Sequence, residues 1–297
     1  MIDGIDKKHF IGNTNKGGNE LYIINHHSAP EVMEEIGRLR EVSFTAAGGG
    51  TGKELDIDDF DTCENCYQQL IVYSPEDKEI IGGYRFIDCS KVLSELQAGK
   101  QAISTAHYFH FSDTFLTNYL PKTIELGRSW IQPSFQPSVN PRKGLFALDN
   151  LWDGLGAIVV NNPSIAYFFG KVTMYPSYNK EARGALQYFM QHFFPDKEAL
   201  VRPIKPLFFE LEDDRFKQEI TGLTFKEAHK VLQKFIRAHG EFIPPLINNY
   251  MQLSDTMLTF GTANNTDFGN VQETGILITI DDIHQVKKER HINLFKK

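Results

Sequence analysis

Several residue types and patterns that define whole classes of protein are scarce in this chain. Its 297 residues include only three cysteines, too few for a disulfide framework, which indicates a reducing compartment. A membrane-spanning helix needs about 18 consecutive apolar residues, and no apolar run in the chain approaches this length. The first ten residues, MIDGIDKKHF, lack the apolar core of a signal peptide. We therefore expect a cytoplasmic protein without a membrane span.

Basic residues are also in deficit. The chain has 31 Lys and Arg against 38 Asp and Glu, a formal net charge of −7. Nucleic-acid binding needs a basic face, so no nucleic-acid partner is expected. The last twelve residues, VKKERHINLFKK, are the exception, with five Lys or Arg. One interpretation is a solvated, frayed terminus, and the other is weak peripheral contact with an anionic membrane.

Two segments look like ligand-binding motifs but lack required residues. GGGTGK at 48–53 has Ala47 where a phosphate-binding P-loop needs its first glycine, and Glu54 where it needs Ser or Thr. This segment is therefore interpreted as a glycine-rich loop. Cys63 and Cys66 form a single CxxC pair with no second pair to complete a zinc site, so no metal is predicted.

The apolar residues, 41% of the chain, are arranged with two different periods. Short β-rich runs predict strands at 21–26, 68–74, 79–89, 123–132, 165–174 and 276–280. Capping boxes at 28–31 (SAPE) and 224–227 (TFKE), with apolar residues at helical spacing, predict helices at about 28–44, 144–160, 180–194, 224–236 and from 245 onward. The order predicts an α/β protein with a mixed layered domain over 1–195 and an α/β extension over 196–297 packed on it.

Charged residues occur on elements that otherwise have a buried pattern. They are Arg40 (with Phe44 one turn later), Asp58, Asp61, Arg85, Glu125 and Arg128. A lone buried charge costs several kcal/mol, so these side chains are expected to pair with one another or to hold a polar ligand. A structural ion-pair network without a chemical role is the alternative interpretation.

The order of these residues carries a family resemblance. The series R-x-x-x-F, D-x-x-D, G-x-R and E-L-G-R resembles the GNAT-like N-acyltransferases that take acyl groups from acyl carrier protein. One branch contains the acyl-homoserine-lactone autoinducer synthases, and the other contains the ornithine- and glycine-lipid N-acyltransferases, often labelled haemolysins. ELGRSWIQPSF, LFALDNLWDGLG and IPPLINNYMQL look like the second branch. The glycine-rich insert is similar to that of members whose acceptor is glycine.

The resemblance implies a fold and a reaction. The fold is a GNAT-like mixed sheet flanked by helices and splayed between the strand with Glu125 and the strand at 165–174, where a phosphopantetheine arm enters. The reaction is N-acylation of an amino acid, with glycine expected, using acyl-ACP or acyl-CoA as co-substrate and no tightly bound cofactor. The alternatives are an autoinducer synthase that uses S-adenosylmethionine and a non-catalytic lytic or lipid-binding protein.

Catalytic roles follow for two residues of ELGRSW. Glu125 is expected to be the general base, with Arg128 beside it. Side chains alternate along a flat strand and would separate this pair, so a bulge near Gly127 is expected as well.

Further residues are expected to bind the two substrates. The acceptor's carboxylate would bind Arg85 or Arg128. Asp58 and Asp61 would orient these arginines or meet the acceptor's ammonium group, and Arg40 and Phe44 are the remaining acceptor-site residues. The donor phosphate would bind Arg142, Lys143 and Gly144 at a helix start, with a solvated loop as the alternative interpretation of this segment. Phe168, Phe169 and the apolar face of the helix at 180–194 either line an acyl tunnel or fill the core.

Overall fold

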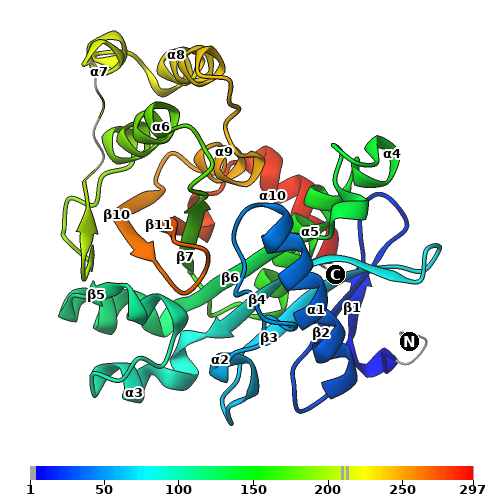
Figure 1. Cartoon of the computed structure of the whole chain (residues 1–297). Coiled ribbons are helices and arrows are strands. Elements are labelled where there is room, and N and C mark those ends of the chain that lie inside the picture. Colours follow the sequence, from blue (N-terminus) through cyan, green and yellow to red (C-terminus); the bar gives the residue numbers. More distant parts are fainter. Residues whose placement is uncertain (1–4, 209–210, 212–213, 297) are drawn as a thin grey trace.

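A nine-stranded sheet organises the molecule in this computed structural model, which describes residues 5–208, 211 and 214–296 (Figure 1). The strand order is β1-β2-β3-β4-β6-β7-β11-β10-β9. β6 and β7 run parallel, and the other neighbours are antiparallel. The bounds are β1 (Phe10–Asn13), β2 (Glu20–Ile24), β3 (Gln68–Ser74), β4 (Glu79–Asp88), β6 (Thr123–Ile131), β7 (Tyr167–Met174), β9 (Pro206–Leu207), β10 (Leu258–Asn265) and β11 (Val271–Thr279).

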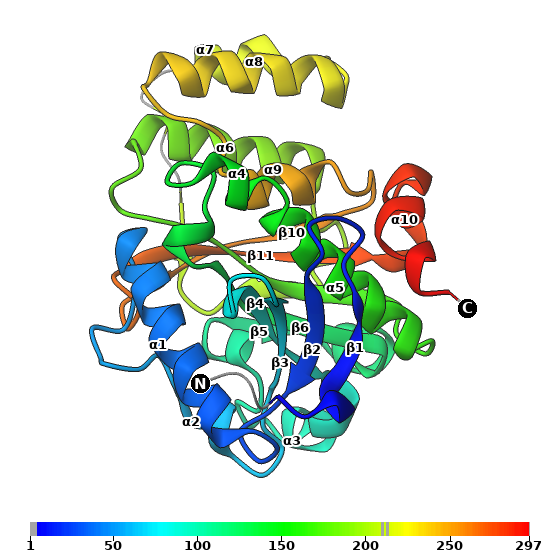
Figure 2. The ribbon, with the colours of Figure 1, turned by 90° about the vertical axis from the view of Figure 1, so that its right-hand side faces the viewer.

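Helices cover both faces of this sheet, and α7 and α8 form a further layer above α6 and α9 (Figure 2). Their bounds are α1 (Pro30–Ala46), α2 (Asp59–Thr62), α3 (Leu93–Gln97), α4 (Pro141–Gly144), α5 (Ala147–Asn161), α6 (Lys180–Phe193), α7 (Arg215–Ile220), α8 (Phe225–Ala238), α9 (Pro245–Met251) and α10 (Gln285–His291). β5 (Phe109–Phe111) and β8 (Val201–Pro203) form a separate two-stranded sheet. The predicted α/β class is confirmed.

The alternation of side chains along β7 shows how the sheet divides the core. Phe168 and Val172 point to the face covered by α6, where they join Phe189 in the largest buried cluster. Phe169, between them in sequence, points to the other face and packs with Phe115. A strand with apolar residues on both faces belongs in the centre of a sheet, because each face needs its own covering layer.

The sheet opens between its two parallel strands. β6 and β7 pair only from Thr123↔Tyr167 to Leu126↔Gly170. Beyond that point β6 stays paired with β4 and β7 stays paired with β11, so the two strands diverge. In the same stretch the β4–β6 register shifts between Gly83↔Trp130 and Arg85↔Gly127, which adds one residue to β6. The predicted splay and the predicted bulge near Gly127 are both present.

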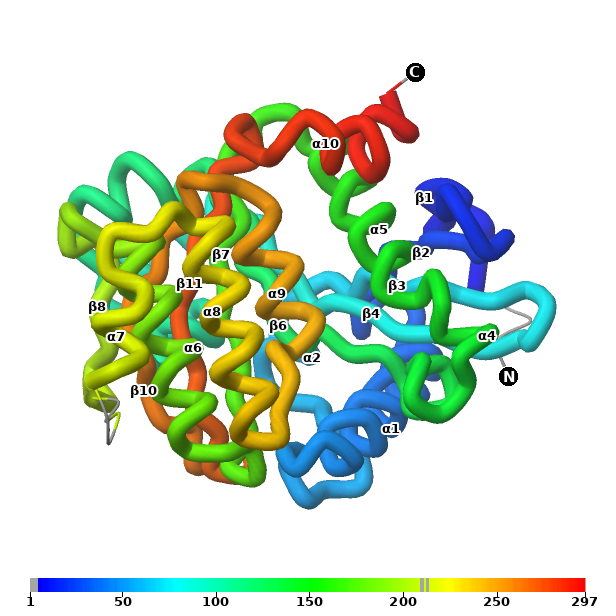
Figure 3. The backbone as a smooth tube through the Cα atoms, turned by 90° about the horizontal axis from the view of Figure 1, so that it is seen from above, coloured from blue at the N-terminus to red at the C-terminus, as the bar shows by residue number. Residues whose placement is uncertain are grey.

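The region after residue 195 completes the same sheet. β11 pairs with β7 over eight residues, from Gln272↔Met174 to Thr279↔Tyr167, and β10 and β9 follow outward. Seen from above, α8 lies beside α6 of the preceding region, and α9 lies beside α8 (Figure 3). The predicted extension therefore contributes one wall of the opening between β6 and β7.

The basic C-terminal tail is docked on the body of the protein. His291 is buried, with Nδ1 2.7 Å from Oδ1 of Asp153 on α5, and Ile292 is buried beside it. The α5 residue Gly156 allows this approach, because a Cβ there would lie 1.8 Å from the His291 carbonyl oxygen. The interpretation as a frayed terminus is wrong for the described residues up to 296. Within the described chain, none of the helices combines the length and apolarity needed to cross a bilayer.

Candidate active site

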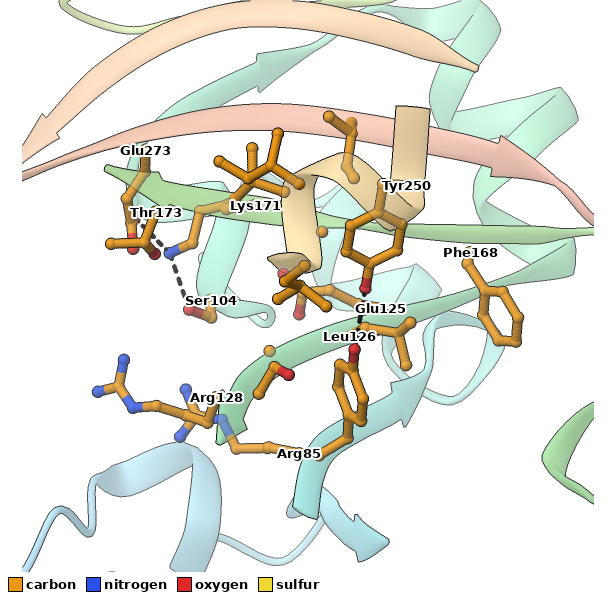
Figure 4. A pocket seen from close by; sticks show the side chains of 18 of the residues that line it. Arg85, Ser104, Glu125, Leu126, Arg128, Phe168, Lys171, Thr173, Tyr250 and Glu273 are labelled. Carbon is orange, nitrogen blue, oxygen red and sulfur yellow. Dashed lines mark hydrogen bonds and ion pairs between the residues drawn. The ribbon is translucent and has the colours of Figure 1, made fainter. Parts of the chain in front are cut away.

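A cleft of about 220 Å³ lies where β6 and β7 part (Figure 4). One end is apolar and is lined from β7, β11 and α9, by Phe168, Val172, Ile276, Ile278, Pro245 and Leu246. The other end is charged and is lined by Arg85, Ser104, Glu125, Arg128, Lys171 and Glu273. An apolar pocket with a few converging polar groups is the usual form of a small-molecule site. The cleft can therefore hold a long apolar group with its reactive end among the charges.

Glu125 occupies the charged end on β6 and is fully buried. The Tyr67 hydroxyl donates to Oε2, and the Thr105 backbone N–H donates to Oε1 at 2.8 Å. The Ser104 N–H in turn donates to the Tyr67 oxygen at 2.9 Å. Burial, followed by the negative charge of Glu125, raises the pKa of Tyr67 well above its usual value, so Tyr67 remains a neutral donor. These bonds fix the orientation of the carboxylate.

The predicted charges converge in a buried cluster beside the cleft. Arg40 donates from Nε to Asp56 at 3.0 Å and from its two terminal nitrogens to Asp61 at 3.2 and 3.1 Å. Arg85 donates to Asp58 at 2.7 Å and to Asp61 at 3.1 Å. Burial raises the pKa of Asp61, but the two guanidinium groups outweigh it and hold that pKa well below its usual range. Asp61 is therefore ionised, and the three aspartates position the arginines.

Arg128 lies on the bulge and turns toward this cluster. Its φ of 45° is in the left-handed region, which a non-glycine residue rarely adopts. Its Nε is 2.9 Å from Oδ2 of Asp56, and its guanidinium lies over Phe268 at 4.3 Å and over Phe44 at 6.0 Å. The expectation that Arg128 lies beside Glu125 is therefore corrected: Arg128 pairs with Asp56, which was not among the predicted site residues.

Two charged residues of the cleft were not predicted at all. Lys171 on β7 has its Nζ 2.8 Å from Oε2 of Glu273 on β11, and both side chains are largely buried. The ammonium also lies 3.4 Å from the Ser104 hydroxyl and 4.3 Å from the centre of the Tyr108 ring. Their strands are far apart in the sequence, and a single lysine in the apolar run YFFGKVTM was the only available signal.

Comparison with known proteins places the chain in a family. Residues 39–142 match the family described as Acetyltransferase (GNAT) domain. The glycine N(alpha)-acyltransferase of Bacteroides thetaiotaomicron is 54% identical over 282 residues, covering 95% of this chain and 83% of its own. The chain belongs to this acyltransferase family. The glycine N(alpha)-acyltransferase of Phocaeicola vulgatus is 51% identical over 284 residues, covering 96% and 87%.

The family identifies the chain as an N-acyltransferase of the GNAT type. Among solved structures, the CoA-dependent acyl-homoserine lactone synthase BjaI aligns with a TM-score of 0.42 and 13% identity, covering 94% of this chain and 90% of its own. The synthase LasI aligns with a TM-score of 0.32 and 16% identity, covering 53% and 74%.

The predicted acceptor residues of this acyltransferase lie at two depths. Phe44, Arg85 and Arg128 line the cleft together with Glu125. The lining does not include Arg40, Asp58 or Asp61, and of these Arg40 and Asp61 have no exposed surface. Direct contact of Arg40 or Asp61 with a substrate does not fit their absence from the cleft lining. Their geometry supports an indirect role, in which they hold Arg85 and Arg128 at the cleft wall.

The predicted donor residues lie outside the lining of this cleft. Arg142 and Lys143 are exposed on α4, and Lys143 forms an ion pair with Asp77 in the turn between β3 and β4. Gly144 packs against the backbone of Pro137, where a Cβ would lie 2.4 Å from the nitrogen. The helix expected to begin at Gly144 begins three residues later, as α5. Donor binding by these residues remains a prediction.

Two other expectations can be placed. Phe168 and Phe169 line the cleft, whereas the α6 residue Phe189 is buried in the core beneath α8, so the core interpretation holds for that helix face. The glycine-rich loop is held by Glu41, which accepts from the backbone N–H groups of Thr51 at 2.9 Å and Gly52 at 2.8 Å. A carboxylate of the chain itself thus occupies donors that a P-loop would offer to phosphate.

Proposed function

We propose that this acyltransferase moves a 3-hydroxy fatty acyl group from acyl carrier protein to the α-amine of an amino acid, with glycine as the acceptor, in bacterial aminolipid synthesis. The observation that carries the proposal is the identity of 54% and 51%, over nearly the whole chain, with two proteins named glycine N(alpha)-acyltransferase. The cleft supports it, because it combines an apolar end with buried carboxylates.

The reaction needs a neutral amine, a polarised thioester carbonyl and a leaving thiol. The amine nitrogen attacks the carbonyl carbon, the new C–N bond forms, and the C–S bond breaks to release the carrier's thiol. Glu125 is the base that takes the ammonium proton, directly or through water. The bulge residues Gly127, Arg128 and Ser129 line the cleft without pairing to β7. Backbone N–H groups in such a stretch suit the developing oxyanion.

The acyl donor needs two further surfaces. The apolar lining from Phe168 and from the α9 residues Pro245 and Leu246 suits the fatty chain. The exposed cations Arg142 and Lys143 suit an acidic carrier protein and the phosphate of its prosthetic group. The same chemistry would accept acyl-CoA less well, since a single basic pair matches one phosphate better than several.

Peripheral contact with an anionic membrane is part of this proposal. The product is a lipid, and the docked tail exposes Val286 and Leu294 beside its cations. Two weak signals of this kind give reversible binding only.

The test is an acceptor and donor panel. Purified protein is incubated with a 3-hydroxyacyl-ACP or the matching acyl-CoA and with glycine, ornithine, serine or S-adenosylmethionine, and amide products are identified by mass. We expect N-acylglycine, formed faster from acyl-ACP. Absence of amide with every amino acid, or product only with S-adenosylmethionine as acceptor, would contradict the proposal.

A further inference from the structure

The charged end of the cleft contains one cation and one anion that the proposed reaction leaves unused. Lys171 and Glu273 form an ion pair whose side chains are 10% and 4% exposed, and both face the cleft (Figure 4). We propose that this pair binds the zwitterionic acceptor, with Lys171 receiving the α-carboxylate and Glu273 the α-ammonium group. The inference rests on the proposed transfer to an amino acid and names the site that selects it.

Charge balance makes a zwitterion the matching ligand. A buried ion without a partner is costly, and the Lys171–Glu273 pair has no net charge. An amino acid with one carboxylate and one ammonium inserts between the two side chains and leaves each of the four charges paired. An amine without a carboxylate would separate Lys171 from Glu273 and leave the lysine unmatched. Ornithine would add a net positive charge, so neutral amino acids are favoured.

The position of Lys171 brings the acceptor to the proposed base. Lys171 follows Gly170, the last β7 residue that pairs with β6. Glu125 pairs with Phe169, two residues before Lys171, so Glu125 and Lys171 lie on the same face of adjacent strands. Strand spacing and rise place their Cα atoms at least about 8 Å apart, since the strands diverge after Gly170. An amine bound near Glu273 then has Glu125 within reach across the cleft.

A hydrogen-bond chain connects the two groups. The Ser104 hydroxyl lies 3.4 Å from Lys171 Nζ, and the Ser104 N–H donates to the Tyr67 oxygen at 2.9 Å. Tyr67 donates to Glu125. Lys171 and the proposed base Glu125 are therefore both held by the segment Ser104–Thr105. This fixes the acceptor's carboxylate, bound to Lys171, relative to the carboxylate that takes a proton from the acceptor's ammonium group.

The arginine cluster is a poorer site for the acceptor's carboxylate. Arg85 is 1% exposed and already bonds two aspartates, and Arg128 is paired with Asp56. The most exposed member of the cluster is Asp58, at 34%, which lies 3.8 Å from Arg128. An anion approaching Arg128 would meet this negative charge. The earlier expectation of Arg85 or Arg128 is thus replaced in this proposal by Lys171.

The first test uses the unmodified enzyme. kcat/KM is compared for glycine and glycinamide with one acyl-ACP, each referred to the concentration of the ammonium form that Glu273 is proposed to bind. A charge-assisted hydrogen bond to the carboxylate predicts a preference for glycine of about 10- to 100-fold. Values within about threefold of each other would overturn the inference while leaving acyl transfer to glycine intact. If the enzyme acylates neither compound nor any amino acid, the proposed function itself has failed.

The second test uses variants. Lys171→Met should raise the KM for glycine at least about tenfold, leave the KM for acyl-ACP within about twofold, and remove most of the preference over glycinamide. The charge-swapped Lys171→Glu/Glu273→Lys variant keeps an ion pair but reverses it, so the KM for glycine should stay high. Full recovery in this swap would assign the pair a purely structural role. Lys217→Met is the control, since it removes a lysine paired with Asp214 on the surface.

Discussion

Replacing Glu125 by glutamine tests the proposed base, because it removes the negative charge and the basicity while keeping the shape of the side chain. The buried carboxylate accepts one hydrogen bond on each oxygen, from Tyr67 and from Thr105. Glutamine keeps an oxygen that accepts from the Thr105 N–H. Its NH₂ group replaces the oxygen that accepts from Tyr67, so the Tyr67 hydroxyl must accept a hydrogen bond where it donates one in the wild type. Losing this charge-assisted bond costs about 1.5–3 kcal/mol of stability, so the variant should stay folded at assay temperature.

The catalytic effect should be larger than the structural one. Loss of a general base typically lowers the rate about 10²–10⁴-fold, and we expect a fall in kcat of this size at pH 7. The deficit should shrink at high pH, where the acceptor amine is already unprotonated. Tyr67 does not titrate in this range, because burial and the charge of Glu125 raise its pKa well above normal.

A matched control separates basicity from geometry. Tyr67→Phe removes one hydrogen bond to Glu125 but keeps the carboxylate, so its kcat should fall less than about tenfold. The assay is steady-state amide formation from acyl-ACP and glycine between pH 6 and 9. A Glu125→Gln enzyme within about threefold of wild type, or one whose loss equals that of Tyr67→Phe at every pH, would refute the assignment. The base would then be sought among other cleft carboxylates or an ordered water.

Three further outcomes are expected. Arg40→Met should lower the free energy of unfolding by about 3–5 kcal/mol at pH 7, measured by denaturant titration, because it removes one of the two arginines that pair with each of the buried Asp56 and Asp61 carboxylates. The folded state lowers the pKa of Asp61, so the ionised Asp61 stabilises the wild type above about pH 4. This stabilisation is lost as the pH falls through the pKa of Asp61 in the folded state, so the difference in unfolding free energy between wild type and Arg40→Met should shrink in acid. Alanine at both Arg142 and Lys143 should raise the KM for acyl-ACP and reduce its salt dependence, and unchanged carrier binding would place the phosphate site elsewhere. Deleting 287–297 should lower thermal stability, because it removes His291, one of the partners of the buried Asp153, and it should also reduce binding to anionic vesicles. Equal stability before and after would contradict the docked tail.

The sequence predicted much of the fold because local pattern and tertiary structure agree there. The run at 68–74 is a strand at those bounds, and the capping box at Thr224 begins α8 as expected. The capping box predicted at 28–31 is wrong. The N-cap of α1 is Ala29, and Ser28 donates its N–H to the Asn25 side chain in a preceding turn. β10 was missed because its Gly261 and asparagines have low strand propensity, and pairing with β11 and β9 holds it in place.

The site was predictable where its residues share one strand or one short motif. Glu125 and Arg128 are in one string, and the glycine between them gave the bulge. The partner of each charge was less accessible, because Asp56 is one of four closely spaced acids and only the fold selects it. Lys171 and Glu273 meet through the β7–β11 pairing, a long-range contact that no local spacing encodes.

A single-turnover experiment tests the central claim most directly. Enzyme in excess is mixed with a 3-hydroxyacyl-ACP and ¹³C-labelled glycine, and the labelled amide and the freed carrier thiol are measured together. If the β6–β7 cleft transfers the acyl group to the amine, the two should appear at the same rate and in equal amounts, and both should slow in Glu125→Gln. Thiol release without labelled amide would show thioester hydrolysis and contradict the account.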